Sequence, residues 1–166
     1  MGKIVNVVLN SNNAINAAPL AANNNSLNYF IDWSAILKDG KSYRLHWTYT
    51  SQLNTFTIAT KLPQLRVDFQ MDNYLNKSST YGAPNTTFIG NLQPKQIVNN
   101  TTWSLYADDS NNPPTYLTTR PYNNTFNVQV VTNDAVPTLW VDNAASPVPN
   151  NNYILVLSFQ EEEEED

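Results

Sequence analysis

The sequence predicts an all-β domain built as a sandwich or barrel of about eight or nine short strands. Polar and apolar residues alternate along many short segments, most clearly in Tyr43–Thr50, where Tyr43, Leu45, Trp47 and Tyr49 share one face. Turn-forming residues separate these segments, with 26 Asn and 10 Pro among 166 residues. No segment carries convincing helical periodicity. The alternation therefore favours half-buried antiparallel strands.

In the first half of the chain, each expected strand is bounded by turn-forming residues. The expected strands are residues 3–9, 27–33, 42–50, 55–60 and 65–71. Asp39-Gly40 predicts a tight turn into the third strand. Ala35-Ile36-Leu37 could form a single helical turn. Residues 10–25 and 73–85 are expected to be loops.

The second half contains weaker and stronger candidates. Residues 87–89 and 96–98 are weaker strands separated by Pro94, and apolar residues at 103, 105, 116 and 117 flank a polar loop at 107–114. The stronger strands are residues 126–131, 138–142 and 153–159. The last segment is apolar on both faces, which predicts a central and covered strand.

The tryptophans separate into two groups. Trp33, Trp47 and Trp103 fall at core-type positions, which favours core filling over a sugar-binding role. Trp140 lies between Leu139 and Val141 and so points to the opposite face of an expected strand. It is either an exposed interface anchor or a residue covered by a neighbouring loop, and the sequence does not separate the two.

The charge is unevenly distributed. The chain has 9 Lys and Arg against 14 Asp and Glu, and six of those acids are its last six residues, so residues 1–160 carry 9 − 8 = +1. We predict one domain over residues 1–160 and an acidic tail over residues 161–166 that is disordered alone. The tail is either a solubilising end or a hook for a basic partner. A neutral body disfavours nucleic-acid binding.

Residues able to do chemistry are scarce. The chain has no Cys, and its single histidine, His46, falls on the polar face of its strand beside Arg44. Neither a catalytic triad nor a zinc site is indicated, and we predict a protein that is not an enzyme and has no cofactor. Asp108–Asn112 could offer oxygen ligands to calcium, although a solvated loop is the simpler interpretation. No apolar run reaches the length of a membrane span, and the N-terminal segment is expected to be a strand, not a signal peptide.

Three groups of segments together resemble the small single jelly-roll minor capsid proteins of large icosahedral double-stranded DNA viruses, of the nucleocytoplasmic type. The segments are Val7–Ser11 with the Asn-rich stretch after it, Tyr29–Ser34 with Tyr43–Tyr49, and Asn112–Leu117 with Arg120-Pro121 and Asn123–Val128. The acidic tail is not part of the pattern.

The resemblance implies a single jelly roll of eight strands, a place in the virion, assembly in the infected host cell, and contact with the double jelly-roll major capsid protein and other minor capsid proteins. A penton subunit at the fivefold vertex and a carbohydrate-binding sandwich are the alternatives. Self-association is also expected. The candidate interface residues are Trp140, Asn111, Asn112, Asn123, Asn124, Glu161, Glu162, Glu163, Glu164, Glu165 and Asp166.

Overall fold

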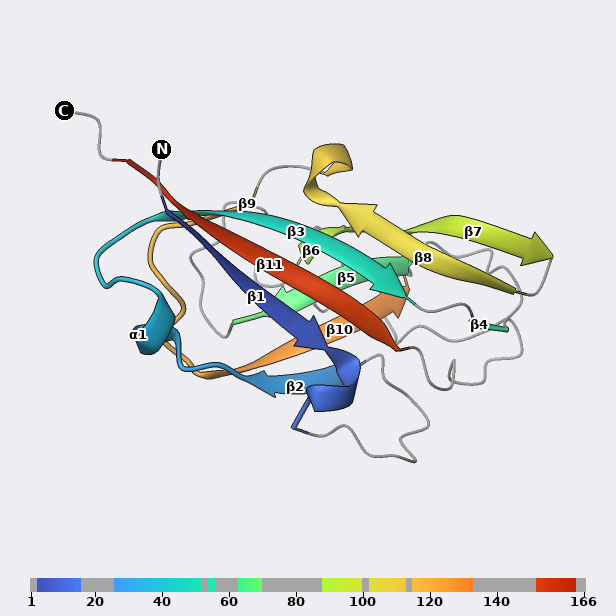
Figure 1. Cartoon of the computed structure of the whole chain (residues 1–166), viewed down its shortest axis with the longest axis horizontal. Coiled ribbons are helices and arrows are strands. Elements are labelled where there is room, and N and C mark those ends of the chain that lie inside the picture. Colours follow the sequence, from blue (N-terminus) through green and yellow to red (C-terminus); the bar gives the residue numbers. More distant parts are fainter. Residues whose placement is uncertain are drawn as a thin grey trace.

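A computed structural model gives the fold of the chain (Figure 1). It describes residues 3–15, 26–51, 54–55, 63–69, 88–99, 102–112, 115–132 and 152–163. The strand expected at 138–142, including Trp140, lies outside these ranges, as do most of the strand expected at 55–60 and the loop at 73–85. No helix in the described ranges is long and apolar enough to cross a membrane.

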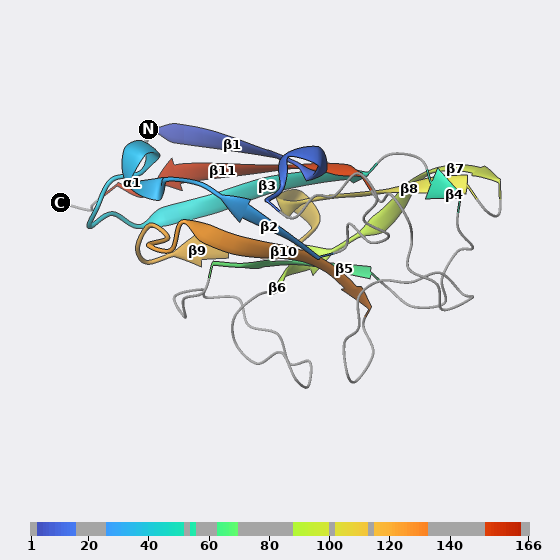
Figure 2. The same ribbon diagram turned by 90° about the horizontal axis from the view of Figure 1, so that it is seen from below.

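Two antiparallel sheets face each other, as the view along their layers shows (Figure 2). The larger sheet contains β1 (Ile4–Asn10), β3 (Tyr43–Ser51), β4 (Asn54–Thr55), β7 (Gln93–Asn99), β8 (Thr102–Asp108), β9 (Thr115–Leu117) and β11 (Tyr153–Glu161). The smaller sheet contains β2 (Ser26–Phe30), β5 (Pro63–Asp68), β6 (Phe88–Asn91) and β10 (Thr125–Thr132). The helical pieces are α1 (Trp33–Ile36) and two 3₁₀ turns, η1 (Ser11–Asn13) and η2 (Asp109–Asn111).

The strand pairings are nested along the chain. β1 pairs with β11, β2 with β10, β3 with β8, and β5 with β6, so that the first strand meets the last and each later pair lies inside the one before. The sheets run β1-β11-β3-β8 and β2-β10-β5-β6. A long antiparallel ribbon that rolls up on itself gives this order, which is the jelly roll. The predicted all-β single jelly-roll sandwich is confirmed.

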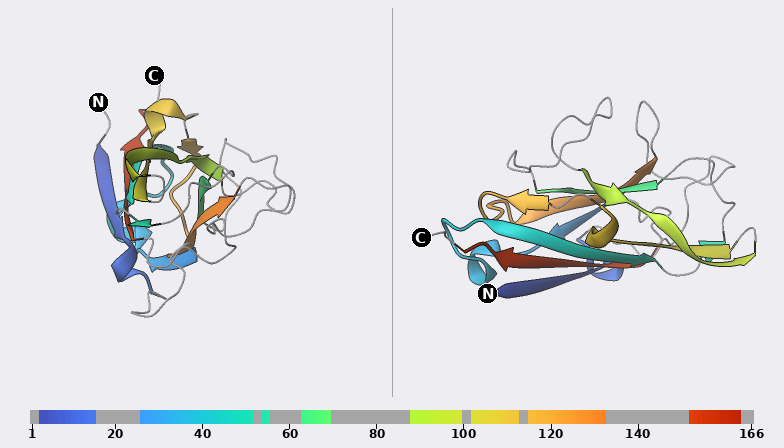
Figure 3. Two further views of the ribbon diagram at one scale, coloured as in Figure 1. Left: turned by 90° about the vertical axis from the view of Figure 1, so that its right-hand side faces the viewer. Right: turned by 90° about the horizontal axis from the view of Figure 1, so that it is seen from above.

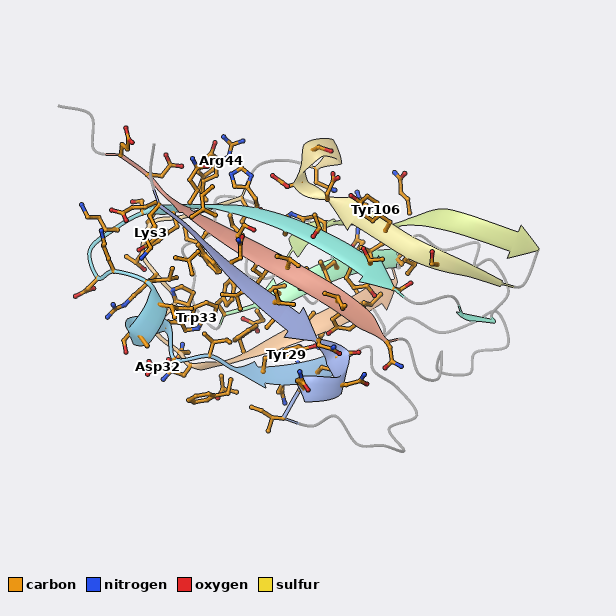
Figure 4. All side chains as sticks on the ribbon, viewed as in Figure 1. Lys3, Tyr29, Asp32, Trp33, Arg44 and Tyr106 are labelled. Atoms are coloured by element: carbon orange, nitrogen blue, oxygen red, sulfur yellow. The ribbon has the colours of Figure 1, made fainter. Side chains whose placement is uncertain are left out.

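The core lies between the sheets and follows from the alternation. Leu45, Trp47 and Tyr49 of β3 are buried, and their neighbours in sequence face outward. At one end of the sandwich, Trp33 contacts three phenylalanines with ring centroids 5.3 to 5.6 Å apart: Phe69, Phe126 and Phe159 (Figure 4). Edge-to-face and tilted contacts of this kind favour a single packed arrangement. Trp33 and Trp47 are core residues, as predicted.

Two expectations about strands were wrong. β2 ends at Phe30, not at residue 33, and Trp33 begins α1, because leaving the sheet lets its indole enter the core. β11 is central, as predicted, but its outer face is not fully covered, because Ile154 is 47% exposed there. The single helical turn does form, two residues earlier than expected.

Candidate interaction surface

The outer face of the larger sheet carries a polar cluster around His46 of β3. His46 Nδ1 lies 2.7 Å from Asp109 Oδ2 in η2, and its Nε2 lies 2.9 Å from Gln160 Oε1 in β11. Asp109 Oδ1 also accepts the backbone N–H of Trp47 at 3.4 Å. His46 and Asp109 are partly exposed, so this cluster fastens η2 onto the sheet and remains open to solvent. We expected His46 on the polar face, and it lies there.

Asp108 organises the turn that presents Asp109. Its side chain accepts the N–H of Ser110, and it accepts the hydroxyl of Tyr106 at 2.9 Å. That bond is the main reason why the pKa of Tyr106 is raised. The carboxylates proposed for calcium are therefore engaged by donors of the chain itself. No group of three or more His, Cys, Asp or Glu side chains suited to a metal occurs in the described ranges.

Asn112 connects the two sheets. Its Nδ2 donates to the carbonyl oxygen of Asp108 at 2.9 Å, and its Oδ1 accepts the backbone N–H of Asn91 in β6 at 3.0 Å. Asn112 also packs against Gly90, where an added Cβ would lie 2.7 Å from Asn112 Cγ. Asn111 closes η2, and its side chain lies outside what the structure describes. The Asn112 amide thus has a structural role, and its interface role stays a prediction.

Asn123 and Asn124 hold the segment before β10 against α1. The Asn123 carbonyl accepts the indole N–H of Trp33 at 3.0 Å, and Asn124 Oδ1 accepts the Trp33 backbone N–H at 3.4 Å. The Asn124 carbonyl accepts the N–H of Ile31 at 2.9 Å. Asn124 is exposed and Tyr122, two residues before it, is 69% exposed, so an amide side chain and an aromatic side chain are accessible to solvent at this end of the sandwich.

The acidic run begins inside the fold. β11 includes Glu161, whose N–H donates to the Lys3 carbonyl at 3.0 Å and whose carboxylate lies 3.3 Å from Lys38 Nζ. Glu162 donates its N–H to the Ser42 carbonyl at 3.0 Å. The domain therefore extends at least one residue further than the expected boundary at 160. Glu162 and Glu163 are exposed, and residues 164–166 lie outside the described residues.

Apolar side chains are also exposed on the outer face of the larger sheet. Ile4 and Val8 of β1 are 49% and 63% exposed, and Ile154 of β11 is 47% exposed. The register places Val8 opposite Val156 and Asn10 opposite Ile154, so these side chains share one region of the face. The views of the sheet in Figure 3 show β1 at its border.

A hollow of about 300 Å³ lies where β1, β3 and β11 meet η1. Its lining consists of Asn10, Asn12, Thr50, Ser51, Asn152, Tyr153 and Ile154, and most of the surface that these residues expose to it is apolar. Ser11 lies next to it and is fixed in place: its hydroxyl donates to Asn152 Oδ1 at 3.3 Å and accepts the Tyr153 N–H at 3.1 Å.

Comparisons with family models, with curated proteins and with solved structures find no match to this chain. No related protein therefore defines the candidate interaction surface, which rests on the contacts within this chain alone. Of the residues singled out from sequence, the structure brings Asn123 and Asn124 together at α1, while Asn112 lies with β6. Asp109 and Gln160 were not predicted as partners of His46, because nothing in a local pattern indicates contacts across 63 and 114 residues.

Proposed function

We propose that the protein is a structural component of a virion, a minor capsid protein that packs with the capsomers of the major capsid protein in an icosahedral shell. The observation that carries this proposal is the nested strand order, β1-β11-β3-β8 facing β2-β10-β5-β6. Viral capsid proteins are among the main users of this architecture. The same class is supported by the resemblance to small minor capsid proteins of Val7–Ser11, of Tyr29–Ser34 with Tyr43–Tyr49, and of Asn112–Leu117 with Arg120-Pro121 and Asn123–Val128.

The packed interior of the sandwich is suited to a rigid structural subunit. The described inner faces bring together aliphatic and aromatic side chains, and the single histidine is on the outside, in a bonded cluster with Asp109 and Gln160. A rigid sandwich holds its loops in fixed positions, and loops held in this way commonly carry recognition. In the proposed role, the end with Tyr122, Asn123 and Asn124 and the acidic terminus contact neighbouring capsid subunits.

Cross-linking within intact particles tests this role. Lys3, labelled in Figure 4, and Lys38 are both exposed and both contact Glu161 at the end of β11. An amine-reactive reagent should join them to major capsid chains in purified virions. The Lys3→Arg/Lys38→Arg variant keeps both charges but lacks these amines, and should lose those links. Links to host proteins only, with none to capsid chains, would contradict the proposal.

A vertex subunit is the close variant of this proposal. A penton protein can also be a single jelly roll, and symmetry limits it to about 60 copies in a shell with twelve fivefold vertices. A protein of the facets would be present in many more copies. The copy number per particle therefore separates the two positions.

Carbohydrate binding is the second candidate, and the hollow to which Asn10, Asn12 and Asn152 contribute side chains favours it. Lectins also use jelly rolls. On a broad glycan array, this candidate predicts a signal that Asn12→Ala and Asn152→Ala abolish, with Asn6→Ala, outside the hollow, as the control. An array without signal removes the candidate and leaves the capsid proposal untouched. A separate Trp140→Ala variant tests whether that aromatic stacks on a sugar.

A further inference from the structure

We propose that two copies of the chain pair through β1, antiparallel and edge to edge, to form one continuous sheet around a two-fold axis. β1 (Ile4–Asn10) is the border strand of the larger sheet and pairs only with β11 among the described strands (Figure 2). A strand in this position presents a row of unpaired backbone groups, which another strand can meet.

The register shows which groups face outward. The N–H of Glu161 bonds to the carbonyl of Lys3, directly opposite, which makes this a hydrogen-bonded pair of the antiparallel ladder. Such pairs alternate along a ladder, so odd-numbered residues of β1 bond to β11. The N–H and C=O groups of Ile4, Asn6 and Val8 therefore point away from the sheet.

The other borders of the two sheets carry features that hinder pairing, and β1 does not. β7 contains Pro94 and Lys95 and has two register shifts, while β6 is four residues long and irregular against β5. β4, β9 and β2 are two, three and five residues long. β1 has seven residues, no charge, no proline and a regular register with β11. Charge, proline and bulges are the usual protections of an edge.

The sequence of β1 identifies a second copy as the occupant. A two-fold axis at Asn6 places Asn6 opposite its symmetry mate and Ile4 opposite Val8 of the other copy, with all of their outward backbone groups in register. Two exposed aliphatic pairs then cover each other on the outer face, and about six backbone hydrogen bonds form. An axis at Val7 would instead place Ile4 opposite Asn10. The hydrophobic pattern therefore selects the register with the two-fold axis at Asn6.

The absence of cysteine allows a direct test on the purified full chain. In the selected register the Asn6 Cα atoms of two copies are about 5.5 Å apart, a separation that a disulfide spans. Oxidation should convert Asn6→Cys to a covalent dimer, whereas Thr50→Cys, exposed on β3 of the same face, should stay monomeric. In sedimentation, Val8→Lys should weaken dimerisation at least tenfold, and Thr48→Lys should not.

Each contrary result would overturn the proposal. These results are a wild-type chain that stays monomeric at all accessible concentrations, a dimer indifferent to Val8→Lys, or an Asn6→Cys dimer that forms no more readily than the Thr50→Cys control. The test uses recombinant protein alone, so its outcome is independent of the capsid proposal.

Discussion

Tyr29 of β2 donates a buried hydrogen bond to Tyr153 of β11 across the gap between the two sheets, with the hydroxyl oxygens 3.0 Å apart. Both side chains are at least 96% buried, and Tyr153 also packs against Tyr49 at a ring-centroid distance of 5.1 Å. This bond links the second strand of the jelly roll to the last strand. It is a polar contact between two buried aromatic side chains, and it gives the sandwich several testable properties.

Removing both hydroxyls should cost less than the sum of the losses from removing each one alone. Tyr29→Phe leaves the Tyr153 hydroxyl buried without its donor, which should lower the free energy of unfolding by about 1–3 kcal/mol. The Tyr29→Phe/Tyr153→Phe double variant leaves no stranded polar group, so its loss should be smaller than the sum of the two single losses. Denaturant unfolding of all four proteins measures this coupling. Additive losses would mean that the two hydroxyls do not interact.

Alkaline pH should destabilise the fold through the same pair. Burial raises the pKa of Tyr29 to about 12, and burial, then Tyr29, raises the pKa of Tyr153 well above its usual value. Because the folded pKa is raised, the stabilisation is complete below about pH 10, where unfolded tyrosine keeps its proton, and is lost as the pH rises towards 12.

For Tyr29 alone, this amounts to about 2–3 kcal/mol across that interval. Denaturant unfolding at a series of pH values should show the decline, and Tyr29→Phe/Tyr153→Phe should show a shallower one. An equal decline in both proteins would place the alkali-sensitive groups elsewhere.

Gly90 of β6 should not tolerate a side chain. A Cβ there would lie 2.6 Å from Trp47 Cζ2 and 2.7 Å from Asn112 Cγ, and Trp47 is only 1% exposed, so its ring has no space to move into. Gly90→Ala should therefore cost about 1–3 kcal/mol of stability, measured by denaturant unfolding. Gly40→Asn is the control. Gly40 has φ 71° with open space around it, and Asn accepts this conformation, so little change is expected.

The contacts of Asp109 with the His46 ring and the Trp47 N–H should contribute modestly to the stability of the fold. Asp109→Ala removes the acceptor of both the His46 ring and the Trp47 N–H. Because the site is partly open to water, the expected loss is about 1 kcal/mol, or a melting temperature lower by about 2–4 °C. Asp39→Ala, in an exposed turn, is the matched loss of a carboxylate. If both variants melt at the same temperature, η2 is held by other contacts.

The sequence predicts the sheets better than it predicts their connections. Alternation along Tyr43–Thr50 and Phe126–Val131 predicted β3 and β10, since the period of two survives whenever one face is buried. Trp33 was assigned to the end of the strand expected at residues 27–33, but it begins α1. Its helical turn depends on Asn123 and Asn124, about 90 residues away, which no local pattern contains.

The candidate surface was predictable only in part. The outward placement of His46 follows from alternation, but its contacts with Asp109 and Gln160 depend on how β3 meets η2 and β11. Ile154 was expected to be covered because Tyr153–Phe159 is apolar on both faces. Its exposure depends on what lies over the sheet, which a strand's own residues do not encode.

Quantification in purified particles tests the capsid assignment most directly. Density-purified virions from the virus or infected host that encodes the chain would be digested with isotope-labelled reference peptides for this chain and for the major capsid protein. We predict a fixed ratio between the two across preparations and gradient fractions, with about 60 copies per particle at the vertices or many more on the facets. A chain absent from clean particles, or present at a ratio that varies from fraction to fraction, would contradict the assignment.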